Sequence, residues 1–111
     1  MKTFVLLMLD DDIWQTFNEG DQNKWILKYR DWAKANDDVI IKADPINTVG
    51  QFISVADGEV IVEPKDYTGD PNHMTGYFIY QAEDWDAAIE FAKGCPTLQY
   101  GGRIELRMVG H

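Results

Sequence analysis

Residues 76–109, GYFIYQAEDWDAAIEFAKGCPTLQYGGRIELRMV, decide the fold. The stretch begins with a strand over residues 76–80, which has bulky side chains on both faces. Asp84 then caps a helix that ends at Gly94. The apolar residues of this helix recur at helical spacing: Trp85, Ala88, Ile89 and Ala92. Residues 103–109 alternate between charged and apolar, which is typical of a half-buried strand. The stretch therefore predicts a strand–helix–strand unit.

The first part of the chain predicts a second unit of the same kind. Residues 3–9 are continuously apolar, which indicates a strand that is covered on both faces. Residues 10–20 read as a connection with a helical turn. Residues 21–37 predict an amphipathic helix capped by Asp21. Its aromatic residues share one face: Trp25, Tyr29 and Trp32. Residues 39–41 follow as a short strand.

A β-hairpin separates the two units. Asp57-Gly58 lies between strand-like runs at residues 49–56 and 59–62, and this dipeptide is a strong signal for a type I′ turn. Residues 63–75 then form a polar loop that is longer than most connections, and loops of this length are often functional. Residues 97–102 are predicted to form a turn before the last strand.

These elements together predict an α+β fold. Without the hairpin, their order is the split β-α-β-β-α-β plan of a ferredoxin-like antiparallel sheet. Two helices cover only one face of such a sheet, yet residues 3–9 and 77–80 are apolar on both faces. We therefore expect the open face to pack against a second copy in a homodimer. A chain of 111 residues is expected to form one domain, residues 1–111.

Charge and cysteine content narrow the functional classes. The formal net charge is −9, which disfavours binding to nucleic acids and to anionic membrane surfaces. We expect neither an export signal nor a membrane-spanning segment. A single cysteine, Cys95, excludes an intrachain disulfide, and a free thiol favours a reducing compartment. The predicted location is the cytoplasm.

Several segments, taken in order, resemble one known family. They are Asp57-Gly58, Gly76-Tyr77-Phe78, the capped Ala-rich helix at 84–92, Cys95-Pro96, Gly101-Gly102 and Glu105-x-Arg107. This series is similar to the YCII-related domain family, also called the DGPF domain. Residues 43–46, Ala-Asp-Pro-Ile, also resemble the family's segment after its second strand. The resemblance implies a ferredoxin-like α+β unit that dimerises through its sheets into an α+β barrel.

The chain departs from that family at the motif that names it. Residues 64–67 read Pro-Lys-Asp-Tyr where the family has Asp-Gly-Pro-Phe, so only the aromatic residue is kept in kind. The YCII-type branch is associated with a His–Asp pair whose histidine lies on the first helix, and residues 21–37 contain no histidine. The resemblance implies lyase-type chemistry, such as elimination of chloride, without that pair.

The long loop contains the predicted catalytic residues. His73 lies there with Asp66 and Asp70. An imidazole beside a carboxylate is a general base with a usable pKa near neutrality, so His73 is the predicted base and either aspartate its orienting partner. The alternative is a solvated histidine among aspartates that form turns.

Four residues complete the predicted site as ligand-binding groups: Tyr67, Trp14, Tyr29 and Asp44. Tyr67 is expected to donate a hydrogen bond or to stack on the ligand. Tyr29 belongs to the aromatic face of the first helix, for which the alternative is a place in the core. The predicted cleft lies between the sheet and residues 63–75. We expect no metal ion and no cofactor at the site.

Other polar or reactive residues are assigned structural roles. Residues 10–12 (Asp-Asp-Asp) are predicted to form a solvated turn before a helix rather than a cation site. Cys95 follows the end of a helix, where the negative dipole end disfavours a thiolate, so it is predicted to be a buried small residue. Arg103 and Arg107 are predicted to pair across the dimer, with an anionic ligand as the alternative.

The sequence thus predicts a small cytoplasmic homodimer that binds a small, apolar or aromatic molecule. The catalytic hypothesis is a cofactor-free lyase or isomerase that uses acid–base chemistry. The alternative is a non-catalytic ligand-binding or regulatory module. The two differ at His73, which an enzyme needs turned inward beside a carboxylate.

Overall fold

A computed structural model of the chain describes residues 1–110, and these residues form six strands and four helices. Their bounds, in chain order, are β1 (Lys2–Leu9), α1 (Asp11–Trp14), α2 (Glu19–Ala35), β2 (Ile40–Pro45), β3 (Val49–Ala56), β4 (Glu59–Asp66), β5 (Gly76–Ala82), α3 (Trp85–Ala92), α4 (Pro96–Gln99) and β6 (Arg103–Met108). None of these helices is long and apolar enough to cross a membrane.

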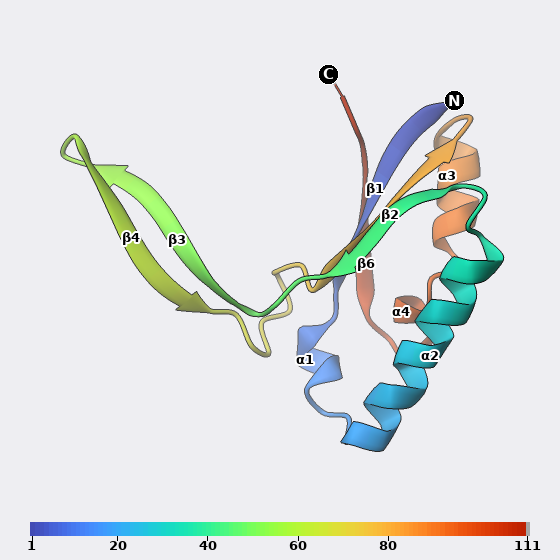
Figure 1. Cartoon of the computed structure of the whole chain (residues 1–111), viewed down its shortest axis with the longest axis horizontal. Helices are drawn as coiled ribbons and strands as arrows, with labels where there is room; N and C mark the ends of the chain where they lie inside the picture. The colour runs from blue at the N-terminus through green and yellow to red at the C-terminus, as the bar shows by residue number, and fades with distance from the viewer. Residues whose placement is uncertain (111) are drawn as a thin grey trace.

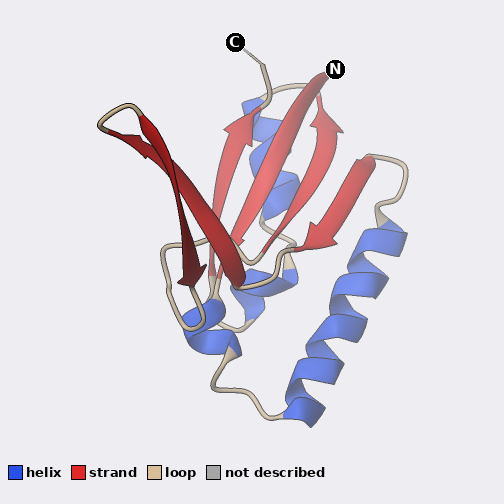
Figure 2. Ribbon diagram, turned by 60° about the vertical axis from the view of Figure 1, so that its left-hand side comes forward, coloured by secondary structure: helices blue, strands red, loops and turns tan. Residues whose placement is uncertain are grey.

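Four strands form one sheet in the order β2-β5-β1-β6, and every neighbouring pair is antiparallel. The two units β1-α2-β2 and β5-α3-β6 interleave in this sheet, because β5 lies between β1 and β2 while β1 lies between β5 and β6. Figure 2 shows α2 and α3 on the same side of the sheet. The α+β class is confirmed, and the arrangement is consistent with a ferredoxin-like plan.

The core lies between this sheet and the helices. Alternation places Phe4 and Leu6 of β1 beside Phe78 and Tyr80 of β5 on the covered face, and all four are buried. Helix α3 contributes small residues to the same core, whereas α2 contacts it through partly buried aromatic residues. These contacts come from Ala88 and Ala92 of α3 and from Tyr29 and Trp32 of α2.

The opposite face of the sheet is also apolar at its centre. Val5 is paired with Ile79, and Leu7 with Tyr77, on neighbouring strands. No helix of residues 1–110 covers these side chains, as Figure 2 indicates. Charged residues flank them on β6, where Arg107 forms an ion pair with Glu105. This face is the one that the sequence predicts to pack against a second copy.

Strands β3 and β4 form a separate two-stranded arm that projects from the body (Figure 1). The predicted Asp57-Gly58 turn is confirmed, with φ angles of 53° and 78°. Many apolar side chains of the arm are exposed: Val49, Phe52, Ile53, Val55, Val60, Ile61 and Val62.

Several predicted bounds are wrong. Helix α2 begins earlier, because Asn18 rather than Asp21 caps it and accepts a hydrogen bond from the Asp21 N–H. Strand β4 continues to residue 66, so the loop covers only residues 67–75. Residues 96–99 form the short helix α4 where a turn was predicted. The predicted Asp84 cap is confirmed, since its carboxylate accepts from the Ala87 N–H at 2.9 Å.

Candidate functional site

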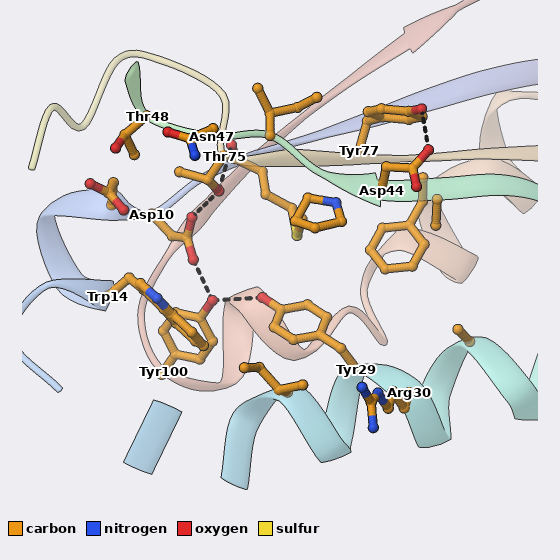
Figure 3. Close-up of a pocket in the computed structure, with 18 of the residues that line it drawn as sticks. Asp10, Trp14, Tyr29, Arg30, Asp44, Asn47, Thr48, Thr75, Tyr77 and Tyr100 are labelled. Carbon is orange, nitrogen blue, oxygen red and sulfur yellow. Dashed lines mark hydrogen bonds between the residues drawn. The ribbon is translucent and has the colours of Figure 1, made fainter. Parts of the chain in front are cut away.

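The larger cleft of the molecule has a volume of about 690 Å³ and lies between α2 and one end of the sheet (Figure 3). Helix α2 supplies one wall, and residues 43–48 together with β5 supply the other. Helix α1 and Tyr100 form its closed end. Most of the lining is apolar or aromatic. It includes the rings of Trp14, Tyr29 and Tyr100 and the polar side chains of Arg30, Asp44 and Thr75.

A carboxylate marks the closed end of this cleft. Asp10 is only 4% exposed, and its two oxygens accept hydrogen bonds from the hydroxyls of Thr75 and Tyr100. The Tyr100 hydroxyl also lies 2.6 Å from the Tyr29 hydroxyl, as Figure 3 shows. No cation forms an ion pair with Asp10 among residues 1–110. Hydroxyl hydrogens therefore satisfy this charge in place of a counter-ion.

Three distant parts of the chain bring this group together. Asp10 directly follows β1, Tyr29 lies on α2, and Tyr100 follows α4. Gly102 allows the close approach, because a Cβ atom there would lie 2.6 Å from Thr97 Cγ2 and 2.9 Å from Asp10 Cβ. The absent side chain lets α4 pack directly against the start of α1.

Burial keeps both tyrosines of the closed end protonated. It raises the pKa of Tyr29 and of Tyr100 far above the usual value near 10. The side-chain hydrogen bond to Asp10 raises the pKa of Tyr100 further, because a second negative charge beside a carboxylate is unfavourable. Both hydroxyls therefore remain neutral hydrogen-bond donors across the physiological pH range.

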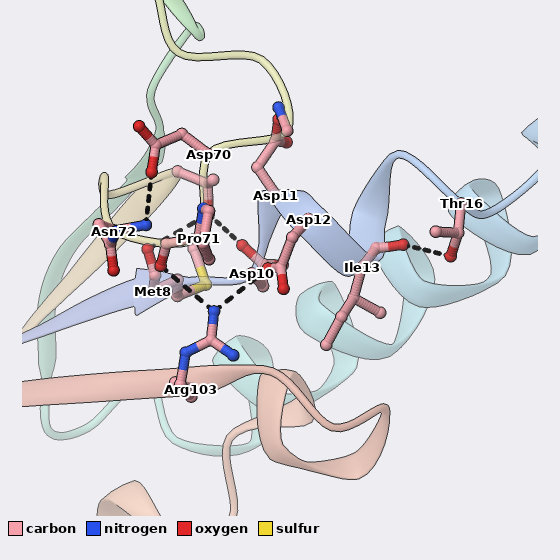
Figure 4. A network of polar contacts seen from close by, with 12 residues as sticks. Met8, Asp10, Asp11, Asp12, Ile13, Thr16, Asp70, Pro71, Asn72 and Arg103 are labelled. Atoms are coloured by element: carbon pink, nitrogen blue, oxygen red, sulfur yellow. Dashed lines mark hydrogen bonds and ion pairs between the residues drawn. The ribbon is translucent and has the colours of Figure 1, made fainter.

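Hydrogen bonds connect the loop of residues 67–75 to the aspartates at the start of α1 and to Arg103 (Figure 4). Asp11 is 3% exposed, and its carboxylate accepts from the Gly69 N–H at 2.6 Å. The Arg103 guanidinium donates to Asp12 Oδ1 and to the Pro71 carbonyl, at 3.2 Å each. Arg103 thus pairs within its own chain. The prediction of a solvated aspartate turn is wrong for Asp10 and Asp11, because strand β1, α4 and the loop enclose them.

Of the predicted catalytic residues, His73 lines a second, smaller pocket of about 230 Å³, together with Tyr67. His73 Nδ1 is 2.9 Å from Asp70 Oδ2, and the imidazole stacks on the Tyr67 ring with centroids 4.0 Å apart. The His73 side chain is 49% exposed. Asp66 is turned elsewhere, since its carboxylate accepts from the hydroxyl and the N–H of Thr68. His73 and Asp70 are therefore close together, as the sequence predicts. Neither residue lines the larger cleft.

The other predicted ligand-binding residues line the larger cleft: Trp14, Tyr29 and Asp44. The Asp44 carboxylate accepts from the Tyr77 hydroxyl at 2.7 Å. The cleft lies against α2 rather than between the sheet and residues 63–75, and Thr75 is the only residue of that range that lines it. Cys95 is fully buried as predicted, and burial raises the pKa of its thiol.

Sequence reasoning missed Tyr100, Thr75 and the burial of Asp10. One signal was available for Asp10, because it directly follows a continuously apolar strand whose end must lie near the core. A second was Gly101-Gly102, which indicates close packing of the backbone. Neither signal identifies the tyrosines as partners, because Tyr29 and Tyr100 are far apart in the sequence and meet only when α2 and α4 pack.

Comparisons with known proteins give a fold relationship. No protein-family model and no curated protein matches the sequence. The structure is similar to that of 5-chloro-2-hydroxyhydroquinone dehydrochlorinase (TftG) from Burkholderia phenoliruptrix AC1100, solved in complex with 2,5-dihydroxybenzoquinone. The TM-score is 0.55 with 16% sequence identity, over 98% of this chain and 94% of the other. At this identity the likeness concerns the fold alone.

Proposed function

We propose that the chain binds a small, flat, mostly apolar or aromatic molecule in the cleft between α2 and the sheet. The observation that carries this proposal is the buried carboxylate of Asp10 at the closed end of an aromatic-lined cleft. Apolar walls with few polar groups at one end are typical of small-molecule sites. The ring of the ligand would lie against Trp14 and Tyr29, and its polar group would face Asp10. A fold neighbour that holds a dihydroxybenzoquinone supports this choice of ligand class.

Replacing Asp10 with asparagine tests this proposal. Asp10→Asn is expected to weaken the binding of hydroxylated benzenes and naphthalenes about tenfold or more, since it removes a charge-assisted hydrogen bond. The measurement is an NMR titration that follows the Trp14 indole N–H, with the indole N–H of Trp85 on α3 as the internal reference.

The matched control is His73→Ala, which removes a side chain of the smaller pocket. Its effect on binding and on the melting temperature is expected to be small, because the imidazole is half exposed. A loss of binding in His73→Ala together with normal binding in Asp10→Asn would move the ligand to the smaller pocket.

A second function is favoured by the hydrogen bond between His73 and Asp70. We propose cofactor-free acid–base catalysis by a lyase or isomerase as this candidate. His73 would take a proton, Asp70 would orient the imidazole, and Tyr67 would stack beside it. The dehydrochlorinase activity named for the fold neighbour supports this class of reaction. Turnover that His73→Ala abolishes would favour the enzyme, and binding without turnover would favour a non-catalytic module.

We further propose that the protein is a cytoplasmic homodimer of the YCII-related kind, joined through the open face of the sheet. Val5, Leu7 and Ile79 lie at the centre of this face and are only partly buried within one chain. Covering them with the same face of a second copy would remove apolar surface from water. The resemblance in sequence order to the YCII-related family supports this assembly.

Replacing Ile79 with glutamate is expected to convert the dimer to a monomer of 12.7 kDa. The new charge would lie at the centre of the contact without a partner, which disfavours association. Light scattering during size-exclusion chromatography at micromolar concentration measures this change. Ile89→Glu, on the exposed side of α3, is the matched control and is expected to stay dimeric. A native monomer under these conditions would contradict the dimer.

A further inference from the structure

Five hydroxyl groups line the larger cleft, and each is engaged with a neighbouring side chain. They belong to Tyr29, Thr48, Thr75, Tyr77 and Tyr100. A hydroxyl has only one hydrogen, so a group that donates to one neighbour has only its lone pairs left for others. The direction of each hydrogen bond therefore decides what the cleft offers to a ligand.

The directions at the closed end follow from Asp10 outward. Tyr100 donates its hydrogen to the Asp10 carboxylate, which has no hydrogen to give in return. In the 2.6 Å contact between the two tyrosines, Tyr29 must then be the donor. The hydrogen bond between Tyr29 and Thr97 must be donated by Thr97 for the same reason. Cys95 donates its S–H to Thr97 at 3.5 Å and is the first donor of this series, whose last acceptor is Asp10.

The remaining hydroxyls of the cleft also donate their hydrogens toward a carboxylate. Thr75 donates to Asp10, and Tyr77 donates to Asp44 at 2.7 Å. Thr68 donates to Asp66 at 2.6 Å, so Thr48 must donate in its 2.9 Å contact with Thr68. Each of the four series ends on a carboxylate, and Figure 3 shows those that reach Asp10 and Asp44.

The hydrogens stay where these contacts place them. Burial holds Tyr29 and Tyr100 in their neutral forms, so each keeps one hydrogen to donate. The lining residues with N–H groups are Trp14, Gln15, Arg30 and Asn47. Among residues 1–110, no side-chain N–H of these four residues is hydrogen-bonded to the Asp10 carboxylate or to the hydroxyl of Tyr29 or Tyr100. The lone pairs of Asp10 and Tyr29 are what the closed end presents.

We propose that the hydroxyls and the carboxylate at the closed end accept hydrogen bonds from a ligand but donate none, so that the cleft selects molecules with a donor, such as phenols and aryl amines. An ether or a carbonyl compound of the same shape would place its oxygen lone pairs against those of Asp10 and Tyr29. Lone pairs that face lone pairs repel each other and gain no hydrogen bond, so such an analogue is expected to bind more weakly. This inference rests on the proposed function and specifies its ligand class.

Two probes of nearly equal shape test the inference on the native protein. They are 2-naphthol, which has one O–H donor, and 2-methoxynaphthalene, which has none. We expect the ether to bind about ten- to a hundredfold more weakly in an NMR titration, since a hydrogen bond to a charged acceptor is lost. Equal affinities for the two probes would overturn the inference. If neither probe binds, the proposed function is overturned with it.

Replacing Tyr100 with phenylalanine tests the assigned directions. Without the Tyr100 oxygen, the Tyr29 hydrogen can turn either to the Thr97 hydroxyl or to an acceptor on a bound ligand, so a ligand acceptor is no longer rejected by Tyr29. The preference for 2-naphthol is therefore expected to fall to about threefold or less. A Tyr100→Phe variant that folds and keeps the full preference would overturn the assignment.

Tyr80→Phe provides the matched control for this substitution. The Tyr80 hydroxyl donates to the Ala88 carbonyl at 2.7 Å and does not line the cleft, so its loss is expected to leave the preference unchanged. A similar loss of preference in both variants would contradict the role given to Tyr100. The comparison of the two probes on the native chain tests the proposal independently of any variant.

Discussion

Leu6→Ala is expected to lower the free energy of unfolding by about 2–5 kcal/mol, the largest single effect that we predict on stability. Leu6 is fully buried at the centre of β1, where Phe78 and Leu106 are its neighbours on the two adjacent strands. Removing most of the side chain would leave a cavity between the sheet and the helices. Urea denaturation at equilibrium measures the loss, provided that the slopes of the two transitions agree.

The matched control is Leu27→Ala on α2. Leu27 is 56% exposed, so we expect a change of less than about 0.5 kcal/mol. Equal losses at Leu6 and Leu27 would contradict the assignment of the covered face of the sheet as the core.

Gly102→Ala is expected to damage both stability and binding. The added methyl group would overlap Thr97 and Asp10, because a Cβ atom at Gly102 would lie within 3 Å of a side-chain carbon of each. Separating them costs about 1–3 kcal/mol of stability, as overpacking in a core does. Because Asp10 forms the closed end of the cleft, we also expect the affinity for 2-naphthol to fall about tenfold or more.

Gly50→Ala tests whether the position, rather than the loss of any glycine, is responsible. No atom lies within 4 Å of a Cβ atom built at Gly50 on the arm, so its substitution is expected to leave binding unchanged. Thermal unfolding and an NMR titration on both variants provide the comparison. Normal binding by Gly102→Ala would mean that Asp10 does not determine the affinity of the cleft.

The elements with strong local signals were predicted well from the sequence. Asp57-Gly58 specified the turn of the arm through its need for positive φ angles, and Asp84 specified the start of α3 through its cap. The bounds that failed depend on competition between neighbouring signals. Asn18 and Asp21 are both good caps, and the chain uses the earlier one. The predicted loop began at residue 63, yet β4 continues through Pro64, which an edge position in a two-stranded arm accommodates.

The candidate site was less predictable because it depends on tertiary contacts. His73, Asp70 and Tyr67 are close in sequence, and the structure does bring them together. The groups at the closed end of the larger cleft come from β1, α2, α4 and the loop, and no spacing rule links these segments. A charged triplet at residues 10–12 also resembles an exposed turn by composition. The packing of α4 and of the loop against it explains why its first two members are buried.

The two ends of the β3–β4 arm lie side by side where they join the body. The arm therefore has the geometry of a removable insertion. The Tyr67 N–H donates to the Thr48 carbonyl at 2.8 Å, so the chain leaves the body and returns to it at neighbouring points. The buried core of the described residues contains no side chain from the arm. A short turn in its place would therefore preserve the path of the backbone. Arm and core are separable modules, and the arm can be exchanged or redesigned while the core is kept.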